Sequence, residues 1–172
     1  GGKGAWDCGN LQCASQPVFL DREIRYYYAA GNQLHEREWE LRPQHDGLGM
    51  ATLQPDRFIG LQTNSPRAEF LTLAFRLNGP ALFLNAKTEK TGWVRMELLD
   101  AQANPLPGFS ANRCRPISGD ALDHPIVWER SPELPVDSVV RLRLTAHQAR
   151  VYSLSIPEPN ETPVYHRFYP IR

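Results

Sequence analysis

The sequence carries no net charge and no long apolar run. Lysine plus arginine number 19, as do aspartate plus glutamate, so no net electrostatic field would attract nucleic acid or an acidic membrane surface. No apolar stretch reaches the length of a membrane-spanning helix, about 18 residues. We therefore expect neither nucleic acid nor a membrane as a partner.

Cysteine is also scarce. Cys8, Cys13 and Cys114 form no CxxC pair, and their odd number argues against a disulfide framework. Their spacing fits no structural zinc site. We expect buried or unused thiols and no metal or cofactor, and a Cys8–Cys13 bridge stays open for an oxidising compartment.

Helical periodicity is missing as well, since no window of about eleven residues sustains an apolar repeat of 3.6. Alternation with a period of two is common instead, and it is clearest in Gly92–Asp100. Val139–Thr145 repeats this pattern, and Val151–Ile156 follows after a short polar segment. The latter two predict a hairpin. Such half-apolar strands predict an antiparallel sheet with one buried face.

From Gly47 onward, short apolar stretches alternate with turn residues, which is typical of an antiparallel β-sandwich. The expected strands are Gly49–Leu53, Phe58–Leu61, Glu69–Leu77, Ala81–Ala86, Gly92–Asp100, Pro125–Glu129, Val139–Thr145 and Val151–Ile156. Apolar side chains, Leu71 and Leu73 among them, share one face of Glu69–Leu77. That segment is therefore predicted to be a central strand.

The first 31 residues predict a smaller sheet. Pro17–Leu20 and Ile24–Ala30 are apolar segments joined by a tight turn at Asp21–Glu23. Their combined apolar surface is small, so this sheet needs a packing partner. The charged segment Leu34–Leu41 is expected to be a linker.

Two clusters of polar residues are candidates for chemistry. Asp120, Asp123 and His124 lie close in sequence and would form a catalytic site if they converged in a pocket, but we prefer to interpret them as part of a structural loop. Gly4–Gly9, GAWDCG, places Trp6 and Asp7 on tight backbone, where a ring and a carboxylate suit a sugar-binding cleft. A turn in which Asp7 accepts backbone hydrogen bonds is the alternative.

Several motifs together carry a resemblance. GAWDCG is followed by EIRYYYAA at Glu23–Ala30 and by His35, then by GLGMATLQPDRFIGLQT at Gly47–Thr63 and MELLDAQANPLPGFSANRCRPISGDALDHPIVWE at Met96–Glu129. This order resembles the last blade and the C-terminal sandwich of five-bladed β-propeller glycosidases related to glycoside hydrolase families 32 and 43. Cys8 and Arg57 depart from the serine and glycine that are usual there.

The resemblance implies an all-β chain with three parts. Residues 1–46 would be a remnant of a β-propeller blade and a linker, residues 47–156 an antiparallel β-sandwich of jelly-roll or concanavalin-like type, and residues 157–172 an extended tail. It further implies that Trp6, Asp7 and His35 contact a sugar at the rim of the propeller cleft. The parent protein would be secreted or periplasmic.

Glycoside hydrolysis needs a carboxylic acid and a carboxylate that flank the scissile bond. One blade does not supply this pair, so the resemblance places it upstream of Gly1 and leaves no catalytic residue in this chain. Two functions follow. Either the sandwich packs against an upstream propeller domain and stabilises it, or it is a carbohydrate-binding module of a secreted glycosidase. A solvent-facing Trp93 or Trp128 beside a groove would favour binding, and buried tryptophans would favour packing.

Overall fold

The computed structural model describes residues 1–33, 45–63 and 66–157. Contacts divide the chain into two compact units with the boundary between Pro55 and Asp56, which we call the N-terminal unit and the C-terminal unit. All strand pairings of the described residues are antiparallel, and none of these residues is helical. The predicted all-β antiparallel architecture is confirmed. Accordingly, this part of the chain has no helix with the length and apolarity of a membrane span.

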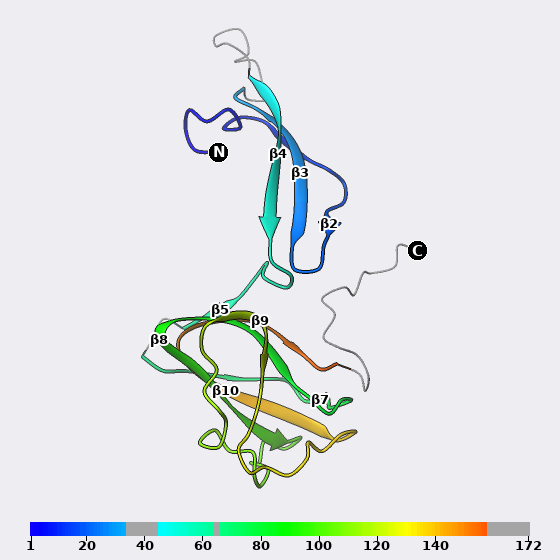
Figure 1. The fold of residues 1–172 in the computed structure, drawn as a ribbon, viewed down its shortest axis with the longest axis vertical. Coiled ribbons are helices and arrows are strands. Elements are labelled where there is room, and N and C mark those ends of the chain that lie inside the picture. The colour runs from blue at the N-terminus through cyan, green and yellow to red at the C-terminus, as the bar shows by residue number, and fades with distance from the viewer. Residues whose placement is uncertain (34–44, 64–65, 158–172) are drawn as a thin grey trace. The chain divides into compact units, whose positions relative to one another are not determined.

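The N-terminal unit is a four-stranded sheet built around β3 (Ile24–Gly31). β4 (Asp46–Leu53) pairs with β3 along its whole length, and Figure 1 shows these two strands side by side. The other edge of β3 carries β1 (Leu11–Cys13) and β2 (Val18–Phe19), which pair with opposite ends of β3. The predicted pairing of Pro17–Leu20 with Ile24–Ala30 is thus observed.

The boundary between the units lies later than the sequence predicts. Gly49–Leu53, predicted as the first sandwich strand, belongs to β4, where Gly49 is opposite Tyr28 of β3. The units therefore divide after Pro55 and not after residue 46. A strand shows the same alternation of side chains in either sheet. Only the strand with which it pairs decides to which sheet it belongs. Leu34–Leu41 and the predicted tail beyond Pro157 lie outside the described residues.

The C-terminal unit is a six-stranded sheet in which β10 is central. Its strands are β5 (Leu61–Gln62), β6 (Ala68–Leu71), β7 (Phe75–Arg76), β8 (Phe83–Asp100), β9 (Asp120–Pro125) and β10 (Val139–Ser155). β8 pairs with one side of β10, and the short strands β5, β6 and β7 pair with the other. β9 pairs with the far side of β8.

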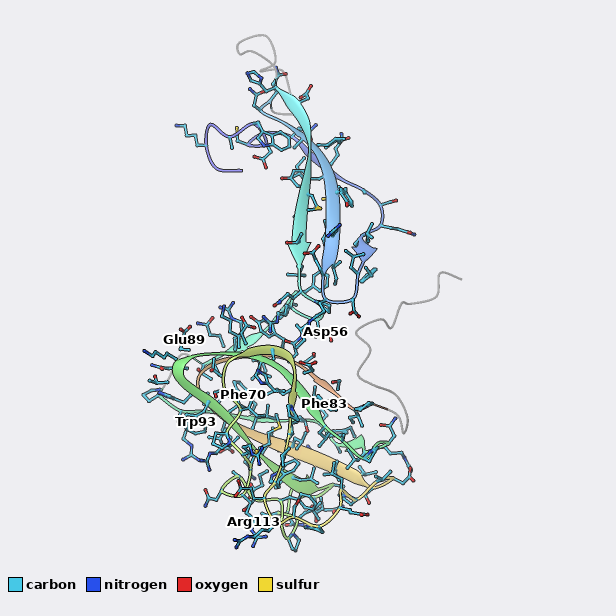
Figure 2. All side chains as sticks on the ribbon, viewed as in Figure 1. Asp56, Phe70, Phe83, Glu89, Trp93 and Arg113 are labelled. Carbon is cyan, nitrogen blue, oxygen red and sulfur yellow. The ribbon has the colours of Figure 1, made fainter. Side chains whose placement is uncertain are left out.

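The two longest strands each replace two predicted ones. Val139–Thr145 and Val151–Ile156 do not form a hairpin, because β10 continues through His147 to Ser155. The pairing with β8 shifts register between His147 and Ala149, and Gln148 has a φ of 44°. A bulge of this kind bends a strand without ending it. β8 bends at the matching point near Glu89, labelled in Figure 2.

This shared bend lets one sheet supply both sides of a sandwich-like core. Leu84 and Ala86, before the bend in β8, belong to the same core cluster as Val94, Met96 and Leu98 beyond it. All five are completely buried. The alternation predicted within Gly92–Asp100 is confirmed as far as Leu98, because Trp93, Arg95 and Glu97 are only partly buried, but Leu99 is buried as well.

Glu69–Leu77 is not the central strand that its leucines predict. It divides into β6 and β7, both of which pair only with β10 among the described strands. Leu71 is 50% exposed and Leu73 is 85% exposed, whereas Leu77 is buried. Pattern alone misassigns this segment because apolar residues on an edge strand carry the same signal as those in a core.

Two other predicted strands are displaced. β9 covers Asp120–Pro125 and ends where the predicted strand Pro125–Glu129 begins, although Trp128 still forms an isolated bridge with Cys114. The predicted strand Phe58–Leu61 reaches regular structure only at Leu61.

Truncation of Leu142 tests the position of the core. Leu142 lies in β10 and is completely buried. Leu142→Ala should lower the free energy of local opening of β8 and β10 by about 2–5 kcal/mol, because it removes buried methyl groups and leaves a cavity. Hydrogen exchange of the amides in these two strands measures this. Leu73→Ala is the control and should change the same quantity by less than about 0.5 kcal/mol. Equal losses from both variants would contradict the observed burial.

Candidate functional site

Polar side chains gather on the outer face of β8 and β10. Trp93, Arg95 and Glu97 lie on this face of β8, because the residues between them are fully buried in the core. The residues opposite them on β10, in the same order, are His147, Thr145 and Arg143. Figure 2 labels Trp93 on β8, beyond the bend at Glu89.

A cavity of about 380 Å³ opens on this face. Three strand residues line it: Trp93, Arg95 and Thr145. Loop residues complete the lining, namely Arg67 before β6 and the segment that contains Ala111, Asn112 and Pro116. Small-molecule sites in proteins typically have volumes of about 300–1,000 Å³, so this cavity has room for a small ligand.

The charges around the cavity are unevenly paired. Arg143 holds two carboxylates, because its Nη1 lies 2.6 Å from Oε2 of Glu97 and its Nε lies 3.2 Å from Oε1 of Glu69. Arg95 forms no ion pair with any residue that the structure describes. Its guanidinium instead lies 6.0 Å from the centre of the Trp93 ring, within reach of a cation–π contact.

Thr145 gives the cavity a buried hydroxyl. The residue is only 5% exposed although it lines the cavity, and its hydroxyl has no hydrogen-bond partner within the described ranges. Buried hydroxyls in folded proteins are normally hydrogen-bonded, because an unpaired one has lost its contacts with water. The Thr145 hydroxyl is therefore available to a polar group bound in the cavity.

His147 holds one wall of the cavity in place. Its Nδ1 is hydrogen-bonded to the carbonyl oxygen of Pro66, which directly precedes the cavity residue Arg67. The ring of His147 also lies beside that of Trp93, with 6.2 Å between the ring centres. These contacts connect the loop before β6 to the outer face of the sheet.

Trp93 and Trp128, whose exposure bears on the choice between ligand binding and packing, differ in their surroundings. Trp128 is 5% exposed, donates its indole N–H to the carbonyl of Met96 at 2.9 Å and packs edge-on against Phe109. It is a core residue. Trp93 is half-buried and lines the cavity. Trp93 is therefore the tryptophan that lies beside a hollow of the surface, although it is only partly exposed, whereas Trp128 is buried as the packing role would require.

Trp6 and Asp7 come together in the N-terminal unit through Tyr28 of β3. The rings of Trp6 and Tyr28 are stacked, with 6.1 Å between their centres and 4° between their planes. The Tyr28 hydroxyl donates to Oδ2 of Asp7 at 3.1 Å. Gly47 and Gly49 of β4 leave room for these rings, since a Cβ at either glycine would meet Trp6 or Tyr28.

The carboxylate of Asp7 is held by groups of its own unit. The amino group of Gly1, 3.2 Å away, and the Tyr28 hydroxyl lower the pKa of Asp7 and together outweigh the effect of burial, which raises it. The hydrogen bond to Asp7 in turn raises the pKa of Tyr28. Trp6 is 39% exposed. His35, the third predicted sugar-contacting residue, lies outside the described residues.

Asp120 and His124 have structural partners. Asp120 pairs with Arg57 at 2.7 Å and with Lys87 at 3.4 Å. Burial raises the pKa of the Asp120 carboxyl, but these cations outweigh it, so the pKa lies below its ordinary value. Nε2 of His124 lies 3.2 Å from the carbonyl oxygen of Ala86. All three residues lie in strand β9 and not in the predicted loop, and these contacts favour a structural role over a catalytic site at Asp120, Asp123 and His124.

The cysteines are free thiols. Cys8 and Cys13 are not bridged, and Cys114 is buried, which raises the pKa of its thiol. Among the described residues, no group of three or more histidine, cysteine or acidic side chains could hold a metal ion.

Sequence reasoning missed most of the cavity. Trp93 and Arg95 are visible in the sequence as the polar side of an alternating strand, but Arg67 and Asn112 come from loops far away along the chain. No local pattern connects these loops to β8. The only sequence feature that points toward the cavity is the presence of arginines on the polar side of two predicted strands.

Comparison of the chain with protein-family models, with curated proteins and with solved structures found no match.

Titration of Asp7 tests the cluster around Tyr28. In the 1–172 chain, Asp7 should titrate below its ordinary value of 3.8. Its contacts then stabilise the fold above that value, and this stabilisation is lost as the pH falls through the lowered pKa. In Tyr28→Phe the pKa should rise, because one donor to the carboxylate is gone. Carbon-detected NMR of the carboxyl group measures both values. An unchanged pKa in Tyr28→Phe would contradict the hydrogen bond.

Proposed function

We propose that the chain is a non-catalytic part of a glycoside-hydrolase-like protein and that its C-terminal unit binds carbohydrate. The observation that carries this proposal is the position of Trp93 in a cavity that also contains the buried hydroxyl of Thr145. The motif resemblance to propeller glycosidases adds the expectation that the ligand is a saccharide.

The chemistry of the cavity suits a sugar ring. A pyranose has a C–H face that packs on an aromatic ring, and Trp93 offers a large apolar surface with a polar N–H at its edge. Sugar hydroxyls need donors and acceptors around the ring, and the side chains of Asn112 and Thr145 provide both. An arrangement of one aromatic surface and a few polar groups is typical of small-ligand sites.

The proposed absence of catalysis rests on the carboxylates. Asp7 accepts a hydrogen bond from the Tyr28 hydroxyl, and Asp120 is held by Arg57 and Lys87. Glu97, the acid closest along β8 to the cavity residues, is bound to Arg143. A glycosidase needs two carboxyl groups that face one another across the scissile bond. These described carboxylates have cationic or hydroxyl partners instead.

A second candidate function is the packing of this chain against an upstream propeller domain. The observation that favours it is the edge of β4, which pairs only with β3 among the described strands. β4 carries Leu48, 88% exposed, and Met50, 48% exposed. An open edge with apolar side chains favours the addition of another strand. The two functions concern different units and are compatible.

Substitution of Trp93 tests carbohydrate binding. The 1–172 chain should bind saccharides on a glycan array, with affinities confirmed by titration calorimetry. Trp93→Ala should weaken binding at least about tenfold, because it removes the stacking surface from the cavity. Phe58→Ala is the matched control, since Phe58 is 61% exposed in the same unit but does not line the cavity, and binding should persist. Loss of binding in Trp6→Ala alone would move the site to the cluster around Asp7.

Assays of hydrolysis test the absence of catalysis. Purified 1–172 chain should release no product from aryl glycosides or oligosaccharides above the rate of a buffer blank. The physical reason is that, among the described residues, the partners of Asp7 are the Tyr28 hydroxyl and the Gly1 amino group and not the second carboxyl group that hydrolysis needs. Turnover that disappears in Asp7→Asn would overturn the proposal.

A further inference from the structure

We infer that the cavity is selective for an acidic saccharide, whose carboxylate or sulfate group is bound by Arg67 and Arg95. This inference rests on the carbohydrate binding proposed above and adds the class of sugar. It follows from the charges around the cavity, from the spacing of Trp93 and Arg95, and from the unpaired hydroxyl of Thr145.

The lining of the cavity carries positive charge only. Arg67 and Arg95 are its ionisable side chains, and the other lining residues are tryptophan, alanine, asparagine, proline and threonine. Two acids lie nearby on the same face, Glu69 and Glu97, but Arg143 holds both of them. The charge of Arg95 is thus not cancelled by a described carboxylate. An anionic ligand would supply the missing partner.

The spacing of Trp93 and Arg95 matches a charged sugar. The two residues lie on the same face of β8 and are two positions apart, about 7 Å along a strand. Because the guanidinium of Arg95 lies over the Trp93 ring at 6.0 Å, a pyranose that packs beside it on the indole would bring a substituent at its edge to that guanidinium. Guanidinium groups bind carboxylate and sulfate oxygens through paired N–H donors, which a neutral hydroxymethyl group cannot reproduce.

The buried polar group completes the site. Thr145 lies opposite Arg95 in the pairing of β8 with β10, and it is 95% buried with no hydrogen-bond partner in the described part of the chain. A sugar oxygen held by Arg95 would lie near this hydroxyl. Arg67 approaches from the loop that His147 holds through Pro66, so a second cation reaches the same cavity.

The experiment compares matched pairs of saccharides by titration calorimetry with the 1–172 chain. One pair is a tetramer of galacturonic acid and its methyl ester, and the other is a sulfated galactan oligomer and its desulfated form. The acidic member of at least one pair should bind about ten- to a hundredfold more tightly than its neutral partner, because charged hydrogen bonds are lost in the latter. Which pair shows the difference distinguishes carboxylate from sulfate. Raising the salt concentration should weaken the tighter binding.

Substitution of each arginine tests which side chains bind the acidic group of the saccharide. Arg95→Gln and Arg67→Gln should each reduce the preference for the acidic saccharide about tenfold while leaving binding of the neutral partner within about twofold. Arg76→Gln is the matched control, because Arg76 is exposed in β7 and does not line the cavity. The preference should be unchanged in that variant.

Three results would overturn the inference in different ways. Equal binding of acidic and neutral saccharides, lost in Trp93→Ala, would refute selectivity for an acidic sugar but retain carbohydrate binding. No binding of any saccharide would refute the proposed function itself and the inference with it. A preference for the acidic sugar that survives both Arg95→Gln and Arg67→Gln would also refute the assigned site.

Discussion

The antiparallel pairing of β8 with β10 is the interaction on which the C-terminal unit depends. Both strands run through the unit and bend at matching positions, where the register shifts beside Gln148. Because of this bend, residues from both halves of β8 enter a single apolar core. The other strands attach to the edges of this pair. The continuous pairing of β8 with β10 thus forms both layers around the core. Two separate sheets would otherwise be needed.

The same pairing positions the cavity. A strand directs alternate side chains to opposite faces, so the residues that anchor β8 in the core also orient Trp93 and Arg95 on the outside. The carbonyl of Met96 accepts the indole N–H of Trp128, which connects this part of β8 to the core. Side chains that extend from a rigid, packed strand are well suited to a binding site, because little conformational entropy is lost when a ligand binds.

Two arginines of this unit show how surroundings determine the role of a residue. Arg57 is almost buried, and its guanidinium bonds to Asn85, Ala121 and Asp120. All of its strong contacts are internal, so it stabilises the fold. Arg95 lies on the outer face, where its described contact is the ring of Trp93. Its hydrogen-bonding capacity remains for a ligand. Their common side-chain chemistry does not distinguish these roles.

The sequence by itself determined the strand character of the chain, because alternation with a period of two is a local property that each segment carries alone. It also predicted the buried side of Gly92–Asp100 and singled out Trp6 and Asp7, which the structure joins through Tyr28. Only the tertiary structure decided that β4 joins the first sheet, that β10 is one bent strand and that Arg67 and Asn112 meet Trp93. These outcomes depend on contacts between residues distant in sequence, and such contacts leave no local pattern that a single sequence displays.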